Sequence, residues 1–357
     1  MEFKSNSCVP TGRVPDMRML KRNYLTWKSF AAIALIIVCC VAVTTKYGLF
    51  SSPKKKDFPP IHHDDPCNSS IYDAKHKEFD YSKIQIYIDD LFPKPLSEAT
   101  AGPNTPVFVS AASSDHVQEA LQMLENFKRF VRKVIPDAKL IIYNLGLTFE
   151  EIKLLKRLCV LEIRDFRFEK YPDHVKIPKG YVFKPIAIQT VLKEYPLVVW
   201  MDSSIRFTQT NISELFEDAN RLGLICTGGD GRVASRTLPG TFKYFNMEPC
   251  AYRSLPEIQA GFGIFKRTEF VVNNIIKPWV GCGLTLGCMM PDGLPDDHFP
   301  CEYRNVYGEC HRYDQSVLSI LLYRAYGTRI EQHKRSYYGP YYVRCIERCT
   351  WDGDDCC

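Results

Sequence analysis

The stretch VVWMDSSIRF, residues 198–207, carries the chain's most distinctive chemistry, because an apolar run ends there in one carboxylate, two hydroxyls and an arginine. Asp202 is followed directly by Ser203 and Ser204. A carboxylate beside hydroxyls can bind a hard divalent cation, a sugar hydroxyl or a ribose. A structural role is equally open, since an Asp at a strand end can close an Asx-turn or cap the next helix, here near Ile212.

The elements around Asp202 alternate in type. Apolar runs typical of strands cover 106–112, 138–146, 160–166, 196–202 and 223–229, and amphipathic stretches typical of helices cover 113–135, 147–159, 183–195 and 211–222. This order predicts one α/β domain, a mainly parallel sheet flanked by helices. Ligands of such sheets bind beyond the carboxyl ends of the strands, so we expect Asp202 at a ligand crevice.

Local signals support the helix assignments. Ser114 and Asp115 are capping residues for the first helix, and Thr148 with Glu151 matches a capping box for the second. Pro185 falls in the first turn of the third helix, where proline is tolerated.

Composition and charge exclude some classes of protein. The chain has 357 residues, of which 45% are hydrophobic, which excludes disorder of the whole chain. Its 46 basic and 41 acidic residues give a net charge of +5, with many of the basic residues before position 57. The rest is close to neutral, so nothing indicates nucleic acid as a partner.

The first hundred residues differ from the remainder. Residues 30–43, FAAIALIIVCCVAV, lack charge, Gly and Pro. We interpret 30–50 as a transmembrane signal-anchor in the lipid bilayer, with a cytosolic tail at 1–29, while a cleaved signal peptide or a buried core helix are the alternatives. Residues 51–105, rich in Pro, Lys, Asp and Ser, are interpreted as a stem, and 106–357 as a lumenal domain.

Cysteine usage indicates the compartment. Twelve of the 15 cysteines lie in the large C-terminal part, which favours disulfides and a secretory-pathway location, the Golgi in a single-pass type II orientation. A zinc site at Cys345, Cys349, Cys356 and Cys357 is the alternative, but the paired CxxC spacing is missing. Sequons at Asn68 and Asn211 agree with a lumenal domain.

FKPIAIQTVLKEYPLVVWMDSSIRF resembles the centre of a GT-A-type glycosyltransferase, in which a basic residue on a helix precedes a strand ending in Asp-x-Asp. EIQAGFGIFKR, CHRYDQSVLSILL and IEQHKRSYYGP follow in the order of that family's later motifs. The likeness spans about residues 106–340. WMDSS and CHRYDQS are similar to an animal group of type II membrane nucleotide-diphospho-sugar transferases.

The resemblance implies a GT-A (Rossmann-like) fold and a divalent metal, usually Mn²⁺, held by the two acids against the diphosphate of a UDP-sugar. This chain departs from it, because Ser204 stands where the second acid is expected. Either another acid supplies the charge, with Asp230 or Asp314 as candidates, or cations such as Lys184, Arg206 or Arg232 neutralise the diphosphate. By analogy His333 is a metal ligand with Asp202 and Ser204, or a surface histidine.

The resemblance also suggests roles for the other residues. Asp202 and Asp314 are the catalytic candidates, and Asp314 also suits the N-cap of the helix that follows it. Donor-binding candidates are Lys184, Asp202, Ser203, Ser204, Arg206, Gln259 and Gly261. Glu257 is a further candidate for hydrogen bonds to sugar hydroxyls. The segment 289–314, with Phe299, Tyr303 and Tyr307, is expected to cover the crevice.

The function expected from these features is transfer of a sugar from a nucleotide-sugar donor to a glycan or glycoprotein acceptor. Two alternatives stay open: a non-catalytic lumenal protein that binds sugar nucleotides or glycans on the same fold, and a disulfide-rich interaction protein without sugar chemistry.

Overall fold

The computed structural model describes residues 67, 70–71, 79–93, 105–158, 161–292, 301, 307–308, 310–335 and 343–345. All of them belong to one compact unit, residues 59–357. The expected tail, the anchor at 30–50 and much of the expected stem lie outside these residues. Within the described ranges, no helix combines the length and the apolar character needed to cross a bilayer.

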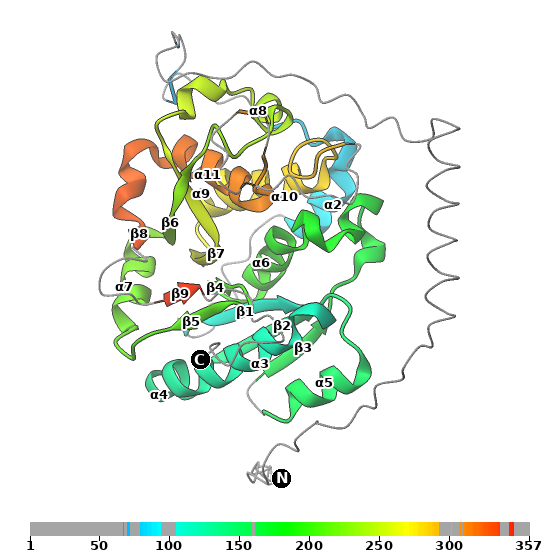
Figure 1. Ribbon diagram of the computed structural model, residues 1–357, viewed down its shortest axis with the longest axis vertical. Helices are drawn as coiled ribbons and strands as arrows, with labels where there is room; N and C mark the ends of the chain where they lie inside the picture. The colour runs from blue at the N-terminus through cyan, green and yellow to red at the C-terminus, as the bar shows by residue number, and fades with distance from the viewer. Residues whose placement is uncertain are drawn as a thin grey trace, which may run out of the picture. The chain divides into compact units, whose positions relative to one another are not determined.

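A seven-stranded sheet forms the centre of this unit (Figure 1). Its strand order is β3-β2-β1-β4-β7-β6-β8. The strands are β1 (Val107–Ala112), β2 (Lys139–Asn144), β3 (Leu161–Asp165), β4 (Leu197–Met201), β6 (Leu224–Arg232), β7 (Pro256–Lys266) and β8 (Lys334–Arg335). Only β7 runs against the others, so the mainly parallel sheet is confirmed. β5 (Ile205–Phe207) pairs separately with β9 (Val343–Cys345).

Helices connect and cover the strands. Their bounds are α2 (Gln85–Leu91), α3 (Val117–Asn126), α4 (Arg132–Val134), α5 (Phe149–Lys156), α6 (Phe183–Glu194), α7 (Ser213–Leu222), α8 (Pro239–Phe245), α9 (Glu269–Val271), α10 (Lys277–Leu284) and α11 (Tyr313–Tyr326). A π-helical turn at 127–131 joins α3 to α4, and another at 272–276 joins α9 to α10.

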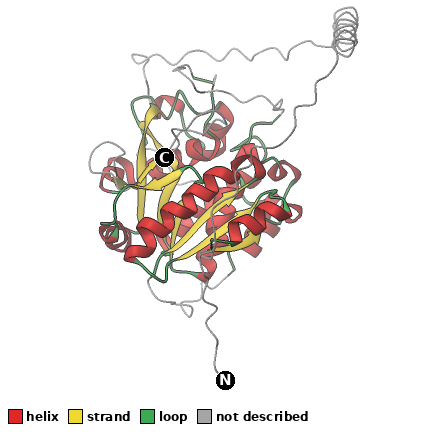
Figure 2. Cartoon of the chain, turned by 60° about the horizontal axis from the view of Figure 1, so that its bottom comes forward, coloured by secondary structure: helices red, strands yellow, loops and turns green. Residues whose placement is uncertain are grey.

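The two faces of the sheet carry separate hydrophobic cores (Figure 2). Val198 and Trp200 of β4 face the core that holds α2, α6, α10 and α11. Leu197, Val199 and Met201 of the same strand face the core of α3, α5 and α7. Burial on both sides explains why this strand is an unbroken apolar run, whose first charged residue comes only where the strand ends.

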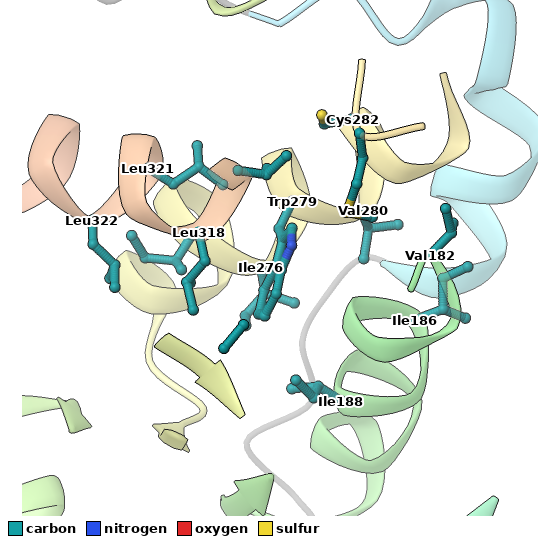
Figure 3. Close-up of a cluster of buried hydrophobic side chains, with 14 of the residues drawn as sticks. Val182, Ile186, Ile188, Ile276, Trp279, Val280, Cys282, Leu318, Leu321 and Leu322 are labelled. Carbon is teal, nitrogen blue, oxygen red and sulfur yellow. The ribbon is translucent and has the colours of Figure 1, made fainter. Parts of the chain in front are cut away.

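The helices α6, α10 and α11 pack side by side in the first of these cores (Figure 3). Trp279 and Val280 of α10 lie among Ile186 and Ile188 of α6 and Leu318 of α11. Interiors packed to crystal-like density tolerate little displacement, so α10 fixes the start of α6 relative to the start of α11.

The local helix signals had mixed outcomes. The capping box of α5 is confirmed, because Thr148 Oγ1 accepts from the Glu151 N–H and Glu151 Oε2 accepts from the Thr148 N–H. The capping prediction for Ser114 and Asp115 was wrong, because the N-cap of α3 is His116 and has no side-chain cap. The Ser114 hydroxyl lies 2.6 Å from Glu151 Oε2 and 3.0 Å from Gly146 O instead. Tertiary partners therefore replaced the local cap.

Part of the expected stem belongs to the folded unit. Ile84, Ile88 and Leu91 are buried in the core, and the Gln189 side chain of α6 donates to Leu91 O at 2.8 Å. The low hydrophobicity of residues 51–105 as a whole concealed this short amphipathic helix.

The expectation of disulfides is confirmed. The described cysteines form Cys67–Cys250, Cys282–Cys288 and Cys301–Cys310. Cys226, counted among the disulfide candidates, is a free buried thiol, and burial raises its pKa to about 12. The side chains of the suggested zinc site near the C-terminus lie outside the described residues.

We predict that Phe108→Ala lowers the free energy of unfolding by about 3–5 kcal/mol. Phe108 is fully buried and its ring meets the rings of Phe127, Phe207 and Phe216. Phe149→Ala, the same change at a residue that is 76% exposed, should cost less than about 1 kcal/mol. Urea unfolding of both variants measures the difference, and equal losses would contradict the burial of Phe108 among these rings.

Candidate functional site

Lys184 occupies the centre of the site. It is the second residue of α6, and its side chain is 2% exposed. Its ammonium lies 3.0 Å from Asp202 Oδ1 and 2.5 Å from Asp314 Oδ2, and it donates to Ala260 O at 3.1 Å. A cation at a helix N-terminus opposes the helix dipole, and the two carboxylates offset that penalty.

Asp202 follows the last residue of β4, as the sequence predicted. Its backbone N–H donates to Gly261 O at 2.8 Å, and its Oδ1 accepts from the Trp200 indole N–H at 2.7 Å. The side chain is 34% exposed, so Asp202 is the member of the cluster that meets solvent. It does not cap α7, whose N-cap is Ile212 without a side-chain cap.

Asp314 is the second residue of α11, and its side chain is 7% exposed. The alternative role as N-cap is wrong, because Arg312 holds that position. The Asp314 oxygen facing Lys184 makes an ion pair without a well-aligned hydrogen bond. Two elements about 130 residues apart in sequence thus place opposite charges in direct contact.

Burial sets the protonation of this cluster. It raises the pKa of Asp314 above its ordinary value; the Lys184 charge opposes the shift, while the nearby Asp202 charge adds to it. The pKa of Lys184 is also raised, because the carboxylates of Asp202 and Asp314 outweigh the cost of burying the ammonium. Lys184 therefore stays charged, and Asp314 takes up a proton more readily than an exposed Asp.

Both helices of the site begin beside a residue in an unfavourable backbone conformation. Tyr181, shortly before α6, has φ 55°, and Tyr313, the first residue of α11, has φ 44°. Their rings lie 6.0 Å apart, and the Lys184 ammonium lies 5.5 Å from the ring of Tyr181. Left-handed conformations of bulky residues are costly and cluster at functional sites.

Gly261 of β7 lies against Asp202. A Cβ at this position would meet Asp202 Oδ2 at 3.3 Å, so the glycine allows the carboxylate to lie close to the strand. Gln259, two residues earlier on β7, pairs with Thr227 of β6 and is half-buried. Both donor-binding candidates therefore lie on the strand next to β4.

Arg206 does not serve the site as expected. Its buried guanidinium donates to the backbone oxygens of Ser203, Ile205 and Glu119 and to the side chain of Gln122. These contacts join β5 to α3, so the arginine stabilises the fold. Ser203 is buried and Ser204 half-buried beside Asp202.

The expected metal ligands are not brought together. His333 directly precedes β8, and two strands, β6 and β7, separate it from Asp202 at the end of β4. Its Nδ1 lies 2.9 Å from Leu224 O. Ser204 contributes a neutral hydroxyl, and the Asp202 carboxylate already meets an ammonium and an indole N–H. No group of three or more His, Cys, Asp or Glu in the described ranges could hold a metal ion. These residues do not fit a divalent cation.

Two of the alternative charged groups, Asp230 and Arg232, lie on β6, apart from Asp202. Asp230 is an exposed residue of β6, separated from β4 by β7, and Arg232 donates to Ser254 O at 3.0 Å. Tyr307 from the segment expected to cover the crevice packs against Phe242, with ring centroids 6.2 Å apart. Phe299 and Tyr303 lie outside the described residues.

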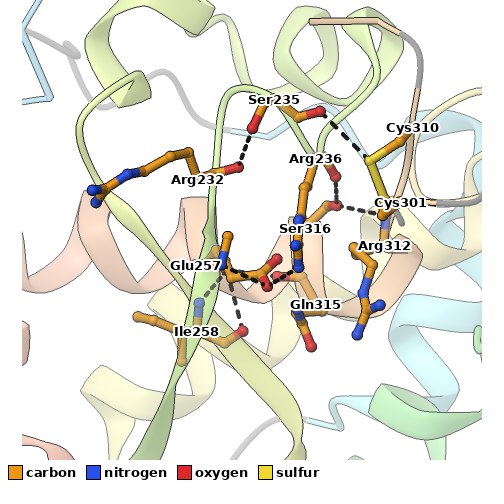
Figure 4. A network of polar contacts seen from close by, with 12 residues as sticks. Arg232, Ser235, Arg236, Glu257, Ile258, Cys301, Cys310, Arg312, Gln315 and Ser316 are labelled. Atoms are coloured by element: carbon orange, nitrogen blue, oxygen red, sulfur yellow. Dashed lines mark hydrogen bonds and ion pairs between the residues drawn. A yellow bond between two sulfur atoms is a disulfide. The ribbon is translucent and has the colours of Figure 1, made fainter. Parts of the chain in front are cut away.

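A second polar cluster lies along α11 and the start of β7 (Figure 4). Arg236 Nη1 donates to Glu257 Oε1 at 2.6 Å, and Gly231 N–H donates to the same oxygen at 3.2 Å. Within the described part of the chain, Glu257 Oε2, Arg236 Nε and Gln315 Nε2 are buried without hydrogen-bond partners. Glu257 was a candidate from the sequence, but its partner Arg236 was not predicted. The glycines of TGGDGR were the available signal, because a Cβ at Gly229 would meet Glu257.

At the level of sequence, this chain matches one family model and no curated protein. Residues 75–189 match the model of a family described as a protein of unknown function, DUF1647. That stretch contains Lys184 and ends before Asp202 and Asp314.

Solved structures with a similar arrangement include several glycosyltransferases. The galactosyltransferase LgtC, solved with donor and acceptor sugar analogues, has a TM-score of 0.31 at 12% identity over 49% of this chain and 59% of its own. Core-mannan synthase A from Aspergillus fumigatus, in its Mn/GDP form, has a TM-score of 0.36 at 12% identity over 77% of each chain. Mouse xyloside xylosyltransferase 1 has a TM-score of 0.33 at 14% identity over 49% of this chain and 71% of its own. At these identities and TM-scores the likeness assigns neither a family nor an activity to this chain.

We predict that Lys184→Met lowers the free energy of unfolding by about 3–5 kcal/mol at pH 8, since two carboxylates lose their buried cation. The loss should be smaller at pH 5. The Lys184 charge lowers the pKa of Asp314, so its removal raises that pKa further above the unfolded value. The folded variant then takes up a proton more readily and gains more stability than the unmodified chain as pH falls.

Urea unfolding at pH 5 and pH 8 tests this expectation. Lys193→Met on the same helix is the matched control, because Lys193 gives one exposed hydrogen bond to Asp90 O. It should cost about 1 kcal/mol or less at either pH. The buried triad of Lys184, Asp202 and Asp314 would be contradicted if Lys184→Met lost no more stability than Lys193→Met, or if its loss did not depend on pH.

Proposed function

We propose that this protein is a glycosyltransferase that moves a sugar from a nucleotide-sugar donor, such as a UDP-sugar, to a hydroxyl of a glycan or glycoprotein. One observation carries the proposal: a buried ammonium holds two carboxylates of different exposure at the carboxyl end of β4. Crevices at that end of an open sheet are where ligands of such folds bind.

The reaction needs one group that takes a proton. The bond between the anomeric carbon and the diphosphate oxygen breaks, the acceptor oxygen bonds to that carbon, and the acceptor hydroxyl loses its proton. Asp314 is assigned as the proton acceptor, because burial has already raised its pKa toward the range useful for a general base. Lys184 stabilises its ionised form before the transfer.

Asp202 is assigned to the donor. It is the exposed carboxylate of the pair, and the indole N–H of Trp200 and the ammonium of Lys184 fix its orientation. It therefore accepts hydrogen bonds from hydroxyls of the donor sugar or its ribose. Gly261 leaves room beside it, and Gln259 and Ser204 extend the polar surface on either side.

The secretory pathway is the proposed location, with residues 30–50 as a type II membrane anchor and the Golgi as the favoured compartment. Three disulfides support an oxidising compartment. The apolar run at 30–43 supports the anchor.

We predict that Asp314→Asn lowers the rate of transfer by about 10²–10⁴-fold while donor affinity changes by less than about threefold. The amide keeps the shape of the side chain but cannot take the proton. The full-length chain is screened with UDP-, GDP- and CMP-sugars, with and without Mn²⁺, against water and a panel of simple glycosides, and released nucleotide is measured.

Asp173→Asn is the matched control, the same change at a side chain that is 94% exposed, and it should leave the rate unchanged. Donor binding without turnover in the unmodified protein would favour the non-catalytic binding protein, in which the ion-paired triad is structural. Absence of binding to every donor would favour an interaction protein without sugar chemistry.

The pH dependence of transfer gives an independent test. Asp314 must be ionised to accept the proton, so the rate should rise with pH through its pKa. Because burial raises that pKa, the half-maximal point should lie above about 4, the value of an exposed Asp. A pH–rate profile of the active protein measures it, and an acid limb at or below pH 4 would contradict the assignment.

A further inference from the structure

The charges of the site leave a nucleotide diphosphate without a counter-ion. Lys184 lies between two carboxylates, so with both ionised the triad has a net charge of −1 (+1 −2). The Arg236 charge is matched by Glu257, and the Arg206 donors are engaged by the backbone. Since the expected metal ligands are not brought together, a leaving diphosphate needs another cation.

Arg312 is a cation in a suitable place. It is the N-cap of α11, two residues before Asp314, and it is exposed. Its backbone is held firmly, because its N–H donates to Arg236 O at 3.2 Å and to Ser316 Oγ at 3.1 Å. Its guanidinium forms no hydrogen bond or ion pair with the residues that the structure describes.

Gln315 provides a second, independent sign of a ligand. Its side chain is more than nine-tenths buried, and its amide nitrogen lacks a hydrogen-bond partner among the described residues. Such a donor is expensive to bury unless something accepts its hydrogen bond. Figure 4 shows the Gln315 and Arg312 side chains extending in the same direction from the first turn of α11.

The start of α11 adds a favourable field. The helix is 14 residues long, and its first turn presents the positive end of the helix dipole. An arginine fork, an unsatisfied amide donor and a helix N-terminus all favour an anion of the phosphate class.

We propose that Arg312, assisted by the Gln315 amide, binds the diphosphate of the nucleotide-sugar donor and takes the place of the metal expected from Asp-x-Asp. The inference rests on the proposed transfer reaction. When the anomeric C–O bond breaks, its electron pair passes to the diphosphate oxygen, and the Arg312 guanidinium neutralises that charge.

Binding of UDP, GDP, uridine and inorganic pyrophosphate to the full-length chain tests the proposal, by calorimetry in EDTA and in Mn²⁺. Arg312→Gln should weaken UDP and pyrophosphate about tenfold and leave uridine unchanged. Arg312→Lys keeps the charge but loses the fork, so its loss should be smaller. Arg129→Gln, an exposed arginine remote from α11, is the charge-matched control and should have no effect.

Thermal unfolding should not distinguish Arg312→Gln from the unmodified chain, because the Arg312 side chain has no partner to lose among the described residues. UDP affinity in EDTA within about threefold of that in Mn²⁺ supports the proposal. Equal UDP affinities of the Arg312→Gln and Arg129→Gln variants overturn it, and so does loss of UDP binding in EDTA.

The failure of this inference can be told from the failure of the proposed function. If sugar transfer is measured but Arg312→Gln does not change UDP affinity, only this inference fails. If UDP, GDP and pyrophosphate all fail to bind, the proposed function fails with it.

Discussion

The site depends on one buried ammonium. Lys184 is 2% exposed, and a charge so buried persists only with compensating partners. Asp202 and Asp314 provide them, and each comes from a different element, so one side chain joins the start of α6, the end of β4 and the start of α11. The same contact keeps Asp314 ionisable in a place where burial alone would favour its protonated form.

The surrounding structure holds these three side chains in register. α10 packs between α6 and α11 through Trp279 and Val280, which sets the position of one helix relative to the other. Tyr181 and Tyr313 adopt costly conformations beside the two helix starts, a cost that the packed core and the ion pairs offset. Gly261 completes the arrangement by leaving the Asp202 carboxylate space against β7.

The fold and part of the site could be predicted from sequence because their signals are local. Periodicity revealed the alternation of strands and helices, and the apolar run before Asp202 placed that carboxylate at the rim of the sheet. Ser114 and Arg206 were misjudged because their partners, Glu151 and the backbone of α3, come from distant segments. The α2 helix inside the expected stem was not predicted, because average composition hides an amphipathic helix of seven residues.

The sequence by itself determined the α/β class, the position of Asp202 after a doubly buried strand, and the absence of a second acid at Ser204. Only the tertiary structure decided that Lys184 lies between two carboxylates, that His333 lies two strands from Asp202, and that the Arg312 guanidinium has no partner among the described residues. The reason is physical: periodicity and strand ends are properties of neighbouring residues, whereas charge balance depends on which distant side chains the packed helices bring within about 3–4 Å of each other.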